Sequence, residues 1–81
     1  MFPGDLVRPH PCSRLGLSAL PHPANVEGNP VLYTVSSDEV CLVLAVIPDD
    51  REEREYDFTH IMVISGERYG WHYRASFEKV E

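Results

Sequence analysis

The sequence predicts one small all-β domain, a barrel of five or six antiparallel strands. Short runs rich in β-branched and aromatic residues are typical of strands, and turn residues separate these runs. No window carries the 3.6-residue apolar period of an amphipathic helix. Because 81 residues leave room for one hydrophobic core, we expect residues 1–81 to form a single domain.

The expected strands follow one another along most of the chain. They cover residues 5–8, 31–35, 40–47, 58–64, 68–73 and 78–80, with one helical turn at 74–77. Ser65-Gly66-Glu67 is typical of a tight hairpin turn, and residues 49–57 form a charged loop. The residues expected in the core are Val40, Leu42, Leu44, Val46, Ile61, Val63 and Val80.

Residues 9–30 contain five of the seven prolines, and we call them the Pro-rich arm. Proline lacks the N–H that a strand ladder needs, so we expect the arm to be extended and irregular. Its leucines have no evident place in a core filled by the strands at 40–47 and 58–64. We therefore expect the arm to contact another protein; the alternative is that it folds back onto its own barrel. The candidate contact residues are His10, Leu15, Leu17, Leu20 and His22.

A cluster of aromatic residues near the C-terminal end supplies a second candidate contact surface. On a strand, Tyr69, Trp71 and Tyr73 share one face, while Gly70 and His72 lie on the other. If the three aromatic residues face outward, they form a protein-interaction surface, since interfaces are enriched in Tyr and Trp. If they face inward, they belong to the core. The sequence leaves both orientations open.

The charge of the chain argues against nucleic acid as its partner. Thirteen acidic residues against seven basic ones give a net charge of −6, whereas nucleic-acid binding depends on basic side chains. The acidic composition of residues 49–57 is typical of a solvated loop, and we favour this interpretation over a docking loop for a basic surface. No apolar N-terminal run indicates a signal peptide, and the apolar run 40–47 is too short to span a membrane. We expect a soluble protein made in a cytoplasm, with no membrane partner.

The sequence carries no convincing site for a metal, a cofactor or catalysis. Two cysteines, Cys12 and Cys41, exclude a dense disulfide framework and favour free thiols over a single bridge. His10, Cys12 and His22, with Cys41 or His72, are possible zinc ligands, but none of them stands in a Cys-x-x-Cys or His-x-x-x-His pair. The nearest nucleophile–base pair is Cys12 with His10, and no Gly-rich phosphate loop occurs. We therefore expect no enzyme activity, metal or cofactor.

Several short motifs resemble a family of small SH3-like barrel proteins encoded by tailed phages. They are Gly4-Asp5-Leu6-Val7-Arg8, the apolar run 40–46, Ser65-Gly66, Gly70-Trp71 and Phe77-Glu78-Lys79-Val80. The likeness covers residues 3–8 and 40–80 and does not include the Pro-rich arm. Signalling SH3 domains carry a tryptophan at the start of the third strand, which residues 58–64 lack, so a groove for proline-rich ligands is not expected.

The resemblance implies a non-enzymatic structural or adaptor protein of the virion, assembled in the host cytoplasm. Such a protein would serve as a capsid decoration or as a head–tail or tail accessory protein, in several copies, bound to capsid or tail protein. Two alternatives stay open at this point. One is a small acidic phage regulator that binds and inhibits a host protein, and the other is a minor barrel subunit of a cellular complex.

Overall fold

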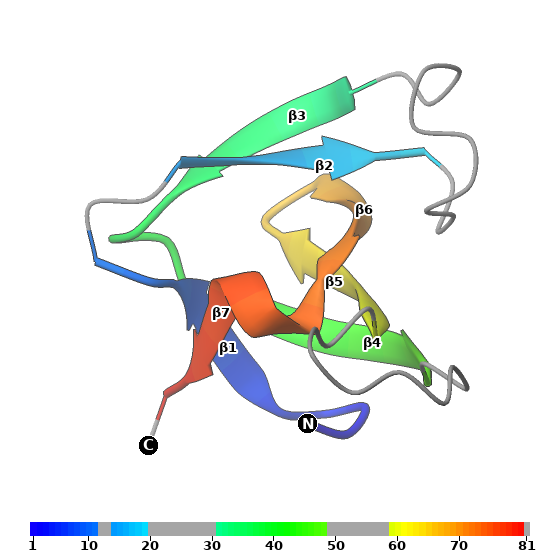
Figure 1. Cartoon of the computed structure of the whole chain (residues 1–81). Coiled ribbons are helices and arrows are strands. Elements are labelled where there is room, and N and C mark those ends of the chain that lie inside the picture. The colour runs from blue at the N-terminus through cyan, green and yellow to red at the C-terminus, as the bar shows by residue number, and fades with distance from the viewer. Residues whose placement is uncertain (12–13, 20–30, 49–58, 81) are drawn as a thin grey trace.

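The computed structural model describes residues 1–11, 14–19, 31–48 and 59–80. Over these residues the chain is all-β, as predicted, and its sheet curls into a half-barrel (Figure 1). The sheet has seven antiparallel strands in place of the five or six expected, because β2 adds a strand that the sequence did not predict. The strands are β1 (Leu6–Pro9), β2 (Arg14–Ser18), β3 (Val31–Ser36), β4 (Cys41–Ile47), β5 (His60–Ser65), β6 (Arg68–Tyr73) and β7 (Phe77–Lys79). A single 3-10 turn, η2 (Arg74–Ser76), joins β6 to β7 within the described chain.

The sheet has the strand order β3-β2-β6-β5-β4-β1-β7, and the meander β4-β5-β6 forms its middle. The β5–β6 hairpin closes at Gly66, whose φ of +64° lies in the left-handed region that favours glycine. Ser65 pairs with Arg68 across this turn. The expected hairpin, the helical turn and the strands at both ends of the sequence are confirmed to within one to three residues.

Part of the Pro-rich arm belongs to the sheet, and the prediction of irregular chain is wrong there. Pro9 is a buried residue of β1, and β2 pairs with β3 on one side and with β6 on the other. The segment Arg14–Ser18 contains no proline, so its backbone can enter the ladder. Pro9 lies beyond the β1 residues that pair with β4, so its missing N–H removes no ladder bond there. Residues 12–13 and 20–30 lie outside the described residues.

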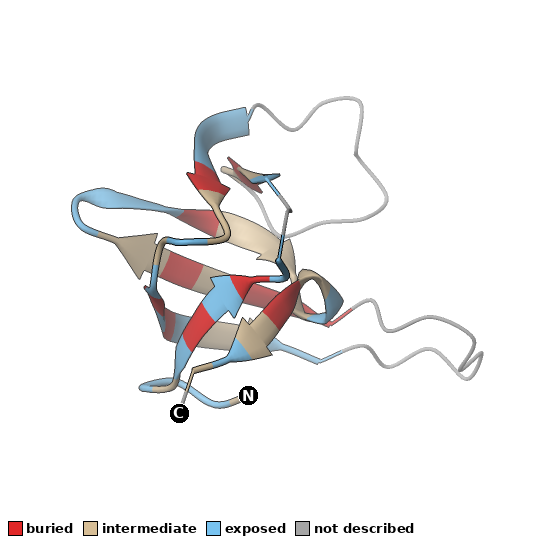
Figure 2. Cartoon of the chain, turned by 90° about the vertical axis from the view of Figure 1, so that its left-hand side faces the viewer, coloured by how far each residue is buried: buried red, intermediate tan, exposed pale blue. Residues whose placement is uncertain are grey.

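The core lies on the concave side of the curled sheet and draws on most of its strands. Buried positions alternate with exposed or half-buried ones along several strands (Figure 2). Burial of Ile61 and Val63 is confirmed, and the packed cluster comprises Val7, Leu17, Val35, Cys41, Val43, Ile61, Val63 and Phe77. Val46 packs at the margin of this cluster, and Val80 is half-buried.

The prediction for β4 assigned the wrong face of the strand to the core. Val40, Leu42 and Leu44 were expected in the core but are 48%, 38% and 39% exposed. Cys41 and Val43 are buried instead, because their partners across the ladder, Val7 and Val63, belong to the core face. This strand is apolar on both faces, so an alternating pattern cannot tell which face is inside.

Candidate protein-interaction surface

The orientation of β6 is set by Gly70, which faces the core. A Cβ at this position would lie 2.7 Å from Leu17 Cβ and 3.0 Å from the Ser18 carbonyl oxygen, so only glycine fits without displacement. Since side chains alternate along a strand, Tyr69 and Trp71 are directed to the outer face. Tyr69 is 53% exposed, and Trp71 is half-buried. Of the two orientations that the sequence allows, the structure has the outward one.

Tyr69 lies at one end of a row of apolar side chains that crosses four adjacent strands. Tyr69 pairs with Ile64, Ile64 pairs with Leu42, and Leu42 pairs with Leu6. Residues directly opposite one another in an antiparallel ladder share a face, with strands about 4.8 Å apart, so the row is about 15 Å long. We call Leu6, Leu42, Ile64 and Tyr69 the outer apolar row. Leu6 is 46% exposed, so the row is open to solvent at both ends.

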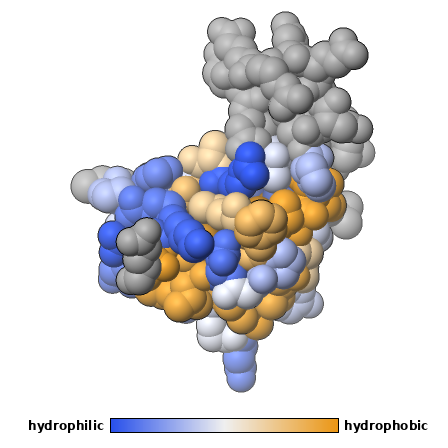
Figure 3. Space-filling model, turned by 90° about the horizontal axis from the view of Figure 1, so that it is seen from below, coloured by the Kyte–Doolittle hydropathy of each residue, from blue (hydrophilic) through white to orange (hydrophobic). Residues whose placement is uncertain are grey.

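Further apolar side chains border the outer apolar row. Met62 pairs with Trp71 on one side and with Ala45 on the other, and a bulge at Leu44 interrupts the ladder there. Elsewhere on the described surface, Ile47 at the end of β4 and Phe2 before β1 are 42% and 75% exposed. Seen from below the view of Figure 1, hydrophobic surface forms broad areas between hydrophilic side chains (Figure 3).

The third aromatic residue, Tyr73, lies in a more enclosed part of the sheet. Its ring centroid is 4.6 Å from that of His60, which is buried. His72 lies on the opposite face of β6, with its ring 6.1 Å from Phe77 of the core. Burial lowers the pKa of His72 to about 4, and the charge of His60 contributes in the same direction. His72 is therefore neutral at pH 7, and Tyr73 is less available to a partner than Tyr69.

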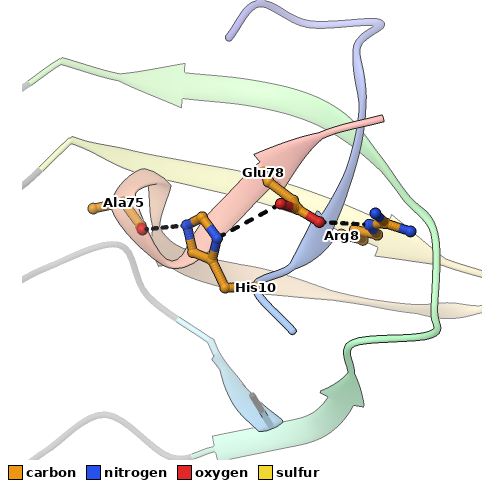
Figure 4. Close-up of polar contacts among 4 residues, drawn as sticks. All are labelled: Arg8, His10, Ala75 and Glu78. Carbon is orange, nitrogen blue, oxygen red and sulfur yellow. Dashed lines mark hydrogen bonds and ion pairs between the residues drawn. The ribbon is translucent and has the colours of Figure 1, made fainter. Parts of the chain in front are cut away.

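His10 contacts its own chain. Its Nε2 atom is 3.2 Å from the Ala75 carbonyl oxygen, and its Nδ1 atom is 3.8 Å from Glu78 Oε2 (Figure 4). Arg8 Nε donates to the other Glu78 oxygen at 2.7 Å. The backbone N–H of His10 also donates to the Ser76 carbonyl, at 3.2 Å. His10 thus connects the end of β1 to η2 and β7 at the surface of the sheet.

The leucines predicted as contact residues of the arm have different positions. Leu17 has no exposed surface, and Leu15 is half-buried against the core, so these two do not form the exposed patch that we expected. Leu20 and His22 lie outside the described residues. Sequence reasoning missed the exposure of Leu6, Leu42 and Leu44. For Leu42 and Leu44 the signal that pointed to it was the unbroken apolar run 40–47, which places apolar residues on both faces of a strand.

The possible metal ligands are not brought together within the described chain. Cys41 is a buried free thiol, and Cys12 and His22 lie outside the described residues. Burial raises the pKa of Cys41, the charge of Glu39 raises it further, and a hydrogen bond with Ser65 opposes both. Over the described ranges, no three His, Cys, Asp or Glu side chains are gathered in a way that could hold a metal ion.

Comparison with protein-family models, curated proteins and solved structures gives no match to this chain. The described residues include no helix with the length and hydrophobicity that a membrane span requires.

Proposed function

We propose that this chain is a non-enzymatic structural or adaptor protein that binds a larger protein assembly through the outer apolar row. The carrying observation is the apolar row on the outer face, in which Leu6, Leu42 and Tyr69 are exposed and Ile64 is half-buried. Single exposed apolar residues are normal, but a row across four strands is the kind of patch that marks an interaction surface. Tyr69 adds an exposed aromatic side chain, a residue type in which interfaces are enriched.

The exposed part of this row is large enough to matter for binding. Leu6, Leu42 and Tyr69 are 46%, 38% and 53% exposed, so full burial of each stabilises a complex by about 1 kcal/mol. Together they supply about 3 kcal/mol, which corresponds to roughly a hundredfold in affinity. A partner that covers the row would bury β4 on both faces, which is the environment that its composition favours.

The finer assignment rests on the sequence resemblance. On this resemblance, we propose that the half-barrel is an SH3-like barrel and that the assembly is a tailed-phage particle. The chain would be a capsid decoration protein or a head–tail or tail accessory protein, present in several copies. The small size and acidic charge suit a protein added to the surface of a larger particle, since net charge keeps the free subunit in solution before assembly.

The test uses phage particles assembled in cells that produce either the wild-type chain or the double variant Leu42→Ser/Tyr69→Ser. Both side chains are exposed, so the double variant is expected to fold. Mass spectrometry of purified particles should find the wild-type chain, whereas the variant loses about 2 kcal/mol, or roughly thirtyfold in affinity, and should be strongly depleted. Glu67→Ser is the matched control, because Glu67 is exposed in the hairpin turn beside β6.

Two outcomes would contradict the proposal. Particles that contain no peptide of the wild-type chain would exclude the virion role, and recovery of the chain with a host protein would favour the acidic regulator. Incorporation of the double variant at the wild-type level would show that the outer apolar row is not the contact surface.

A further inference from the structure

The two edges of the described sheet differ in a way that points to a function for one of them. At one edge, β7 has three residues, two of them charged, and Arg8 pairs with Glu78 beside it. Short, charged edge strands are a common protection against pairing with another chain. At the other edge, β3 has six residues, Val-Leu-Tyr-Thr-Val-Ser, and none of them is charged.

The β3 edge is open to solvent over most of its length. Val31, Leu32 and Tyr33 are 60%, 44% and 41% exposed, and Thr34 is exposed as well. An edge strand directs the N–H and C=O groups of every second residue away from its sheet. Arg68 Nη1 lies 3.5 Å from the Thr34 carbonyl oxygen, which is the long limit of a hydrogen bond. Backbone groups in this arrangement are matched best by another strand.

We propose that β3 pairs antiparallel with β3 of a second copy of this chain, around a two-fold axis perpendicular to the sheet. Such an axis places the same backbone donors and acceptors opposite one another, so the contact is complementary to itself. The net charge of −6 opposes the association of two copies, whereas the strand Val31–Ser36 itself carries no charge. The regular pairing extends from Tyr33 to Ser36, because a bulge at Leu32 shifts the register with β2.

Dimer formation would also relieve a weakness of the fold. A domain of 81 residues buries about two-thirds of its chain surface, and oligomerisation is one of the usual ways in which small domains gain stability. The inference goes beyond the proposed function, because the outer apolar row lies on β1, β4, β5 and β6. Partner binding and dimer formation can therefore be tested separately.

The test is sedimentation velocity of the purified wild-type chain over a range of concentrations, alone and without a partner. We expect a monomer–dimer equilibrium. Thr34→Lys places like charges near the two-fold axis and should raise the dimer dissociation constant by about tenfold or more. Thr34→Val is the matched control, because it keeps the β-branched shape and adds no charge, so it should still dimerise. Circular dichroism establishes that each variant is folded.

Several results would overturn the proposal. A wild-type chain that stays monomeric at every concentration would refute it, and so would a Thr34→Lys variant that dimerises like the wild type. If Thr34→Lys fails to fold, Tyr33→Lys takes its place, because Tyr33 is 41% exposed and belongs to the regular pairing. Tyr69→Ser should dimerise normally, and loss of the dimer in this variant would assign self-association to the outer apolar row instead.

Discussion

Leu17→Ala tests whether the segment after the first prolines is a structural part of the core. Leu17 has no exposed surface and stands against Gly70, where an added Cβ would lie 2.7 Å away. Truncation therefore removes buried apolar surface and leaves a cavity that Gly70, having no side chain, cannot fill. The expected result is a large loss of stability from a residue that sequence reasoning placed on an exposed arm.

The expected magnitude follows from the burial of this side chain. Leu→Ala at a fully buried site costs about 2–5 kcal/mol, and poor filling of the cavity places this one at about 3–4 kcal/mol. A chain of 81 residues has a free energy of unfolding of about 4–12 kcal/mol. The substitution should therefore remove between a quarter and all of the stability. Leu6→Ala is the matched control, because Leu6 is 46% exposed and its truncation should cost about 1 kcal/mol.

The assay is urea unfolding followed by the fluorescence of Trp71, the single tryptophan of the chain. This residue pairs with Ser18, the neighbour of Leu17, so its emission reports on the β2–β6 contact. Low protein concentration keeps self-association out of the measurement. If Leu17→Ala costs no more than Leu6→Ala, β2 is not packed against the core and the fold described for this segment is wrong.

Three further predictions follow from the same packing. Replacing residues 10–29 with a short Gly-Ser linker should give an unfolded chain by circular dichroism, because it removes β2 and Leu17; a folded barrel would contradict this. Gly70→Ala should cost about 1–3 kcal/mol through overpacking against Leu17 and Ser18, seen in calorimetry as a fall in Tm of about 5 °C or more. Burial lowers the pKa of His72 from 6.5 to about 4, so the unfolded chain binds the proton first as the pH falls. The contribution of neutral His72 to the free energy of unfolding is therefore complete above pH 6.5 and is lost towards pH 4. Between pH 7 and pH 5 this costs about 2 kcal/mol in urea unfolding, and His72→Gln should lose that part of the pH dependence; an unchanged dependence would refute the assignment.

Strand positions were predictable where the local signals agree. Arg68–Tyr73 and the turn at Gly66 carry β-prone residues and a glycine at the position that requires a positive φ. Arg14–Ser18 was not predicted, because leucines, a glycine and flanking prolines give little local indication of a strand. Its place in the sheet depends on β3 and β6, which lie far from it in the sequence.

Only part of the candidate site was predictable, because local sequence shows which residues share a face but not which face is exposed. The sequence places Tyr69 and Trp71 on one face of a strand, but it does not say which face is outside. That orientation is decided where Leu17 packs against Gly70, a contact between residues more than fifty positions apart. Leu6 and Leu42 join the row because their strands pair, and their types alone predict burial.

The sequence by itself determined the fold class, most of the strands and the acidic charge, because these depend on residue type and on short-range spacing. The tertiary structure alone decided which face of β4 is buried, that Leu17 is a core residue, and that β3 is left at the edge of the described sheet. The physical reason is that a strand apolar on both faces has no preferred inside until its neighbours cover one of them. The exposed outer row, on which the proposed function rests, follows from which face of β4 is covered, and the β3 edge follows from the order of the strands.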